Sequence, residues 1–264
     1  MRRQAGFTLI EVMLFLAITG LLFLIGIFGT GAQVRSVRFS DSMRGLDSYL
    51  QKQYGLVSTG SNPRDITTTC TSSGALGTPP TFGTGTGTTA GDQSGCVLLG
   101  RLVKFNTGSP NTVNSYYVVG RRLATSQLTG DDMTDLANSG ATLSAQASET
   151  YPISWGINFY QPAAVPAAGQ SQAFAFLRSP STGKIISLTF SMNDISDGTV
   201  PGNDGTFRSA ITSSNIAKNA GYCFKDDGSH KGIIKLGYDQ RTDALDLALE
   251  SNNFNPATDC VRTK

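Results

Sequence analysis

The order of hydrophobic and polar positions divides the chain into three parts. Residues 5–29 are an apolar run that contains one charged side chain, that of Glu11. Beyond it, apolar side chains recur at spacings of 4, 3, 4 and 4 residues: Phe39, Met43, Leu46, Leu50 and Tyr54. This spacing places them on one face of an α-helix and leaves Arg44 and Lys52 to solvent. From Cys96 onward, short runs rich in β-branched and aromatic residues take over.

The first two parts predict one long helix. It runs from about Phe7 to a C-terminal stop signal at Gly55. At the usual rise per residue such a helix is about 70 Å long. We expect residues 7–31 to lie in lipid or in an apolar bundle of helices. Residues 32–55 are expected to pack on a globular domain that spans residues 56–264.

The rest of the chain predicts an antiparallel sheet. Its β-rich runs are short and closely spaced: Val97–Phe105, Tyr116–Leu123, Ile153–Tyr160, Ala173–Leu177, Lys184–Phe190, Tyr222–Lys225, Gly232–Tyr238 and Ala244–Leu249. One short helix is predicted at Asp131–Asn138. Because no long helix separates the strands, the expected fold class is α+β, with the long N-terminal helix laid across an antiparallel sheet.

Residues 71–95 differ from the rest in composition. They are dominated by Gly, Thr, Ser and Pro. Such a segment cannot bury enough apolar surface to form a core, so it predicts a mobile surface loop. The sequence leaves open whether this loop is a functional surface or a tolerated insertion.

The apolar run is long enough to cross a membrane. The 23 residues from Phe7 to Gly29 correspond to roughly 35 Å of helix, against a hydrocarbon core of about 30 Å. Arg2 and Arg3 precede it, so the positive-inside rule places the N-terminus in the cytoplasm. A cleaved signal peptide has a shorter apolar stretch and a small-residue cut site, and a plain anchor gives no reason for Glu11. A charge at the bilayer centre costs about 2.5–3.5 kcal/mol, so Glu11 needs a cationic partner.

The sequence Gly6-Phe7-Thr8-Leu9-Ile10-Glu11 resembles the processing site of type IV pilins and pseudopilins. The resemblance implies that residues 1–6 are a leader, which is cut after Gly6 on the cytoplasmic side. It implies that Phe7 is then N-methylated. It also implies that Glu11 pairs with the freed amine of Phe7 in a neighbouring subunit and so sets the register of assembly. Cleavage thus creates the cation that Glu11 needs.

The middle of the helix both follows and departs from the family pattern. Gly20 falls where the family often has glycine, but Phe28 stands where many major pilins carry proline. Gly26, Gly29 and Gly31 lie nearby. Glycines either loosen a helix, at about 0.5–1 kcal/mol each relative to alanine, or allow close packing in membranes. The sequence leaves both interpretations open.

All the cysteines follow the apolar run: Cys70, Cys96, Cys223 and Cys260. An even number in an exported domain predicts two disulfides. Of the three connectivities, we favour Cys70–Cys96 with Cys223–Cys260, because each pair encloses a local unit and the second bounds the C-terminal region 223–260. No CxxC spacing occurs, which argues against a cysteine metal site.

The charge balance gives no sign of a nucleic-acid partner. The chain has 21 basic and 19 acidic residues, and loss of Arg2 and Arg3 with the leader leaves 19 of each. Some pilins bind DNA through a positive strip, but here the basic residues of the domain are scattered and favour a solvated surface. They are Arg121, Arg122, Arg208, Lys218, Lys225, Lys231, Lys235 and Arg241.

Catalytic signals are sparse, and the sequence predicts no enzyme. His230 is the only histidine and lies in a polar turn, and Glu149 and Glu250 are isolated. No nucleophile elbow, phosphate-binding loop or HExxH motif occurs.

No cofactor is expected. A weak calcium candidate lies in a Gly-rich segment that contains Asp194, Asp197 and Asp204. Carboxylate oxygens suit Ca²⁺, but the spacing does not match an EF-hand and is typical of turns.

The resemblance implies a structural subunit of a type IV pilus or pilus-like filament. Such a protein waits in the cytoplasmic membrane as a single-pass chain with a cytoplasmic N-terminus and then enters a surface filament. Its implied partners are other pilin subunits, a prepilin peptidase/N-methyltransferase, and the pilus assembly platform with its ATPase.

The sequence leaves open which member of the family this is. It does not separate a major pilin from a minor pilin or pseudopilin, nor motility, adhesion, secretion and DNA uptake from one another. The similarity of the whole chain to the family is weak, and this favours a GspH/FimT-like minor member. The alternative from another class is a membrane-tethered adhesin or DNA-binding surface protein that never polymerises.

Overall fold

The computed structural model describes residues 8–60, 68–71, 75–84, 96–105, 109–160, 171–191, 205–209, 211, 220–227, 230–236, 245–249 and 260. Within these ranges, the side chains of 25–32, 68–70, 82–84, 144–148, 171–172, 191, 205–206 and 245–249 are not described. The chain forms two compact units, Met1–Asp41 and Ser42–Lys264.

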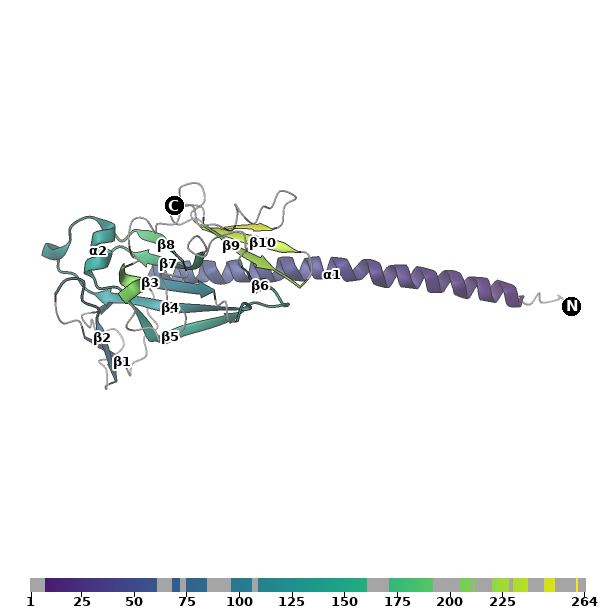
Figure 1. Cartoon of the computed structure of the whole chain (residues 1–264), viewed down its shortest axis with the longest axis horizontal. Helices are drawn as coiled ribbons and strands as arrows, with labels where there is room; N and C mark the ends of the chain where they lie inside the picture. Colours follow the sequence, from purple (N-terminus) through teal and green to yellow (C-terminus); the bar gives the residue numbers. More distant parts are fainter. Residues whose placement is uncertain are drawn as a thin grey trace. The chain divides into compact units, whose positions relative to one another are not determined.

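The N-terminal helix α1 spans Leu9–Thr59 and contributes residues to both units (Figure 1). It is helical throughout the glycine-containing stretch 26–31. It also continues beyond the predicted stop at Gly55, where the hydroxyls of Ser58 and Thr59 donate to the Gly55 carbonyl at 2.8 and 3.0 Å. The helix ends instead at Thr59, and Gly60 directly after it has a φ of 66°, the left-handed conformation that glycine adopts most easily.

The larger unit is built on a five-stranded antiparallel sheet in the order β5-β4-β3-β7-β8. Its strands are β3 (Cys96–Phe105), β4 (Thr112–Arg121), β5 (Thr142–Pro152), β7 (Ser171–Arg178) and β8 (Ile185–Ser191). A four-stranded sheet has the order β11-β10-β9-β6. Its strands are β6 (Asn158–Phe159), β9 (Ala220–Lys225), β10 (Lys231–Leu236) and β11 (Leu245–Leu249).

Smaller elements complete this unit. A two-stranded sheet pairs β1 (Thr68–Thr71) with β2 (Thr81–Thr84). The short helices are α2 (Asp132–Asn138), α3 (Gly205–Ser209) and a 3-10 turn at Thr125–Gln127. The fold is therefore α+β, with the helix packed on antiparallel sheets as predicted.

Three local expectations differ from the structure. The loop predicted at 71–95 includes strand β2, and its residues 72–74 and 85–95 lie outside the described part. The strand predicted at Ile153–Tyr160 is reduced to Asn158–Phe159, because a turn with positive φ at Trp155 (63°) and Gly156 (71°) interrupts it. Strand β5 was not predicted, since its sequence TLSAQASETYP is mostly polar.

Both faces of the five-stranded sheet are covered. On one face, strand residues such as Leu102, Val118 and Leu188 pack with Leu136 of α2 and Phe207 of α3. The opposite face is covered by the part of α1 that belongs to this unit, which carries most of the predicted apolar stripe. Its fully buried members are Met43, Leu46 and Leu50, and its member Tyr54 meets Phe176 of β7 edge-on at 5.3 Å.

Aromatic side chains join the two larger sheets. The ring of Phe105 on β3 stacks on Phe159 of β6 at 4.9 Å and contacts Tyr222 of β9 at 5.1 Å. The Tyr222 hydroxyl donates to the carbonyl of Ala173 on β7 at 3.0 Å. This bond satisfies the polar end of a buried tyrosine and fixes β9 beside β7.

The segment that leads into α2 is held by a buried carboxylate. Asp135 accepts hydrogen bonds from the main-chain N–H and hydroxyl of Thr129, both at 2.8 Å, and from the N–H of Gly130 at 3.2 Å. Burial alone raises the pKa of Asp135, but these hydrogen bonds outweigh it and hold the pKa below its ordinary value. Asp131 caps α2 by accepting from the N–H of Thr134.

Candidate functional site

The first turn of α1 carries both Glu11 and its helix cap. The N–H of Glu11 donates to the hydroxyl of Thr8 at 3.3 Å and to the Thr8 carbonyl at 3.1 Å. Thr8 is therefore the N-cap, and Glu11 is the third residue of the helix, the spacing of a capping box. A carboxylate at this position interacts favourably with the helix dipole and stabilises the helix by about 0.3–1 kcal/mol. The Thr-x-x-Glu pattern of residues 8–11 is the sequence signal for this cap.

The rest of this helical segment is apolar and exposed. Every residue from Thr8 to Leu24 is exposed, including Leu9 at 73% and Phe23 at 71%. The hydroxyl of Thr19 donates to the carbonyl of Phe15 at 2.8 Å, so it leaves no unpaired polar group on the helix surface. Glu11 is the only ionisable residue between Thr8 and Leu24.

Glu11 has no cation of its own in the described part of the chain. It forms no ion pair there, and the first basic residue that follows it in the sequence is Arg35. A cation for this carboxylate therefore comes from outside the described residues or from another molecule. The predicted cleavage and methylation residues, Gly6 and Phe7, lie outside the described residues.

None of the helices in the described ranges combines the length and the apolar character that crossing a membrane requires.

A second polar cluster lies between α1 and the five-stranded sheet. The guanidinium of Arg101 on β3 is almost fully buried and donates to the side-chain oxygen of Gln53 on α1. The same nitrogen donates to Glu149 of β5 at 3.2 Å and to the hydroxyl of Ser115 on β4 at 3.4 Å. We call Gln53, Arg101, Ser115 and Glu149 the Arg101 cluster. It joins one helix to three strands.

The backbone around Arg101 explains its position. A β-bulge between Leu98 and Gly100 shifts the β3–β4 register just before Arg101. Gly100 has no room for a side chain, because a Cβ there would collide with the carbonyl oxygen of Phe176 on β7. Arg101 lies opposite Tyr117 of β4, and its guanidinium carbon lies 3.9 Å from the centre of that ring. The arginine is thus held by hydrogen bonds at its tip and by an aromatic face along its plane.

Glu149 connects this cluster to solvent. Its carboxylate also accepts from Lys52 at 3.1 Å and from the amide of Gln53 at 3.3 Å. Burial raises the pKa of Glu149, but the hydrogen bonds from Lys52, Gln53 and Arg101 together lower it below the ordinary value. From the sequence, Glu149 was predicted to be isolated from other charged side chains. The structure corrects this, because residues distant in sequence bring two cations to one carboxylate.

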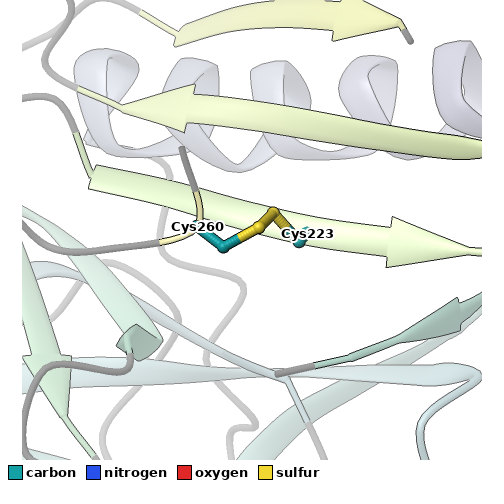
Figure 2. Close-up of a disulfide and its surroundings, with 2 residues drawn as sticks. All are labelled: Cys223 and Cys260. Carbon is teal, nitrogen blue, oxygen red and sulfur yellow. A yellow bond between two sulfur atoms is a disulfide. The ribbon is translucent and has the colours of Figure 1, made fainter. Parts of the chain in front are cut away.

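The cysteines agree with the favoured pairing as far as they are described. Cys223 on β9 and Cys260 form a disulfide, with Cα atoms 5.6 Å apart (Figure 2). Cys96 is disulfide-bonded as well. The side chain of its expected partner, Cys70, lies outside the described residues.

The remaining predicted candidates do not converge on a site. Asp194, Asp197 and Asp204 lie outside the described residues, as does Glu250. Within the described ranges, no group of three or more His, Cys, Asp or Glu side chains is placed to hold a metal ion. His230 is part-buried, and its ring nitrogen lies 2.8 Å from the Asp226 carboxylate in the β9–β10 turn.

The basic residues are likewise dispersed over the sheets. Arg121 donates to the carbonyl of Ala75 at 2.9 Å. Lys225 and Lys231 face each other across β9 and β10. Lys218 and Arg241 lie outside the described residues.

Comparison with known proteins identifies the N-terminal segment. Residues 1–27 match the family described as the prokaryotic N-terminal methylation motif. The chain therefore carries the class III leader of type IV pilins and pseudopilins. No curated protein and no solved structure matches the chain.

Proposed function

We propose that this chain is a structural subunit of a type IV pilus or pilus-like filament. Prepilin peptidase cuts it after Gly6 and methylates Phe7, and the mature chain polymerises through α1. Before assembly it is held in the cytoplasmic membrane by the apolar N-terminal segment, and afterwards it lies in a filament at the cell surface. Other subunits, the assembly platform and its ATPase are its partners.

The observation that carries the proposal is the state of Glu11. A single carboxylate lies in an exposed apolar helical segment and has no cation in the described part of the chain. Cleavage at the methylation motif would create an amine on Phe7, four residues before Glu11 in the sequence. An amine from a neighbouring subunit would neutralise the carboxylate and set the axial register of two helices.

The exposed segment supplies the driving force for assembly. Fully burying one Leu, Ile, Phe or Met side chain is worth about 1.5–3 kcal/mol. Leu9–Leu24 offers many such side chains, so packing it among copies of itself would strongly favour association in water. In the membrane the same side chains contact lipid, and packing is then driven by contacts between helices.

The first experiment concerns processing. N-terminal sequencing and mass spectrometry of the mature protein should give N-methylated Phe7 as the first residue. Deletion of the prepilin peptidase should leave Met1 in place. A mature chain that keeps its leader, or that is cut near residue 30, would contradict the proposal.

The second experiment separates the charge of Glu11 from its helical role. Glu11→Gln keeps the length of the side chain but removes the charge, and it should abolish or strongly reduce filament incorporation while processing continues. Thr19→Val is the matched control, because it removes the other polar group of the segment, which bonds within the helix. Normal filaments from Glu11→Gln would refute the pairing role.

The alternative is a membrane-tethered adhesin or DNA-binding surface protein. It predicts an unprocessed N-terminus, no dependence on Glu11, and binding by monomeric chains. The two experiments above therefore decide between the classes. Immunogold labelling along the filament and at its tip would then separate a major from a minor subunit.

A further inference from the structure

The turn between β5 and β6 presents the only tryptophan of the chain in an unusual way. Trp155 has a φ of 63° and a side chain that is 57% exposed. A bulky residue with positive φ is an outlier, since turns with two successive positive φ values are normally made by Asn, Asp or Gly. Gly156, with a φ of 71°, follows this preference, and Trp155 does not.

The turn is firmly anchored on both sides. Ile153 and Ile157 are buried, at 4% and 0% exposure, so they fix the chain directly before and after the turn. The hydroxyl of Ser42 on α1 donates to the carbonyl of Ser154 at 3.0 Å. The indole is therefore presented by a fixed turn, at the point where α1 enters the larger unit.

One carboxylate lies beside the turn. The Asp227 carboxylate, which is exposed, lies 3.6 Å from the position that a Cβ on Gly156 would occupy. Asp226 lies next to it in the chain and pairs with His230. The turn thus combines an exposed aromatic ring with a carboxylate beside it.

The same chain carries a segment with complementary properties. Within α1, Val34 and Val37 are 44% and 67% exposed, and Arg35 and Arg38 are exposed basic residues in the same two turns of helix. Val34, Val37 and Arg38 share one helix face, because they are spaced by three and four residues. We propose that Trp155 is a subunit contact, which docks on residues 34–38 of α1 in a second copy of this chain.

The chemistry of the two surfaces supports this occupant. The indole would cover the exposed valines, and an arginine of the segment would meet the Asp227 carboxylate or the face of the indole. Tryptophan and arginine are the residues most enriched among the dominant contacts of protein interfaces. The inference rests on the proposed function, since a filament packs the α1 helices of many copies beside the larger units.

The test uses the fluorescence of the full-length protein. Because Trp155 is the only tryptophan, its emission reports this turn alone. Filaments sheared from cells should show blue-shifted emission and several-fold weaker acrylamide quenching than unassembled chains in non-ionic detergent. Equal emission and quenching in the two states would overturn the proposal.

A matched control moves the tryptophan to another exposed apolar position. Leu76 is 48% exposed and lies beside the end of α2, because the N–H of Gly77 donates to Asn138. It is therefore near the start of β5, whereas Trp155 follows the end of that strand. The double variant Trp155→Phe with Leu76→Trp should show no change in emission on assembly. A blue shift of the emission as large as that of the wild type would overturn the proposal, since it would mean that assembly shields exposed side chains in general.

Two further measurements identify the partner. A photo-crosslinking amino acid at position 155 should join two copies, with the crosslink mapping to residues 34–38. Crosslinks only to another protein, to lipid, or to another part of the chain would refute the assignment. Trp155→Gly relieves the backbone conformation and keeps the fold, so it should leave processing intact but reduce filament yield several-fold.

These outcomes are distinguishable from failure of the proposed function. Normal filaments from Trp155→Gly would overturn the contact but leave the filament role standing. Absence of filaments from the wild-type chain, with an uncut leader, would overturn both.

Discussion

Replacing Arg101 by methionine tests whether the Arg101 cluster fixes α1 on the five-stranded sheet. The buried oxygen of Gln53, which is 0% exposed, would lose its donor from Arg101. An unsatisfied buried acceptor costs about 1–3 kcal/mol. Loss of the guanidinium above Tyr117 adds about 0.5–2 kcal/mol. Glu149 keeps Lys52 and contact with solvent, so we expect the total loss to be about 2–4 kcal/mol.

The assay is urea unfolding of the full chain in non-ionic detergent, followed by near-UV circular dichroism. Three variants are compared with the wild type: Arg101→Met, Gln53→Leu and the double variant. The double variant should recover much of the loss, because replacing both partners of a buried polar pair by apolar groups is nearly neutral. Lys52→Met is the control, since its ion pair with Glu149 is exposed and should contribute less than about 1 kcal/mol.

Two results would refute this reasoning. If Arg101→Met costs no more than Lys52→Met, the buried hydrogen bonds do not hold the helix. If the double variant loses the sum of the two single losses, Arg101 and Gln53 act independently and form no functional pair.

Three further predictions concern the larger unit. The hydrogen bonds to Asp135 lower its pKa, so its carboxylate stabilises the fold at pH values above its ordinary pKa of 3.8. This contribution is lost as the pH falls through the lower pKa of the folded state. An acid titration of the wild type and of Asp135→Asn measures it. Replacing Cys223 and Cys260 together by serine should cost about 4 kcal/mol for a 37-residue separation, as measured by urea unfolding. Gly140→Ala should lower the melting temperature more than Gly130→Ala, because both have positive φ but only Gly140 has a main-chain carbonyl where the Cβ would lie.

The periodic parts of the fold were predictable because their burial follows the pattern of side chains. The stripe through Met43, Leu46 and Leu50 is buried as its helical spacing requires. Strand β5 was not predictable, since its sequence is mostly polar and its pairing with β4 is a tertiary contact that gives no local pattern. The turn at Trp155 was missed for a related reason, because a tryptophan gives no local signal for a positive φ.

The processing motif and the Arg101 cluster also differ in how far the sequence predicts them. The processing motif is contiguous in sequence, so Gly6, Phe7 and Glu11 could be recognised together. The Arg101 cluster joins Gln53, Arg101 and Glu149, each separated by 48 residues from the next. Nothing in the sequence distinguishes Arg101 from the other basic residue of β3, Lys104, which is only half-buried. The bulge before Arg101 and the close approach of β7 at Gly100 come from strand pairing, which the sequence does not show.

The two described glutamates differ in where the partner of the carboxylate comes from. Glu149 is matched within the chain, by Lys52 and Arg101, and its pKa is lowered accordingly. Glu11 has the exposed apolar segment around it but no such match in the described part of the chain. A charge whose partner lies within the fold contributes to stability, whereas one whose partner must arrive from another molecule contributes to recognition. On this argument, loss of Glu149 should weaken the folded unit without stopping assembly of the chains that fold, and loss of Glu11 should stop assembly without weakening the folded unit.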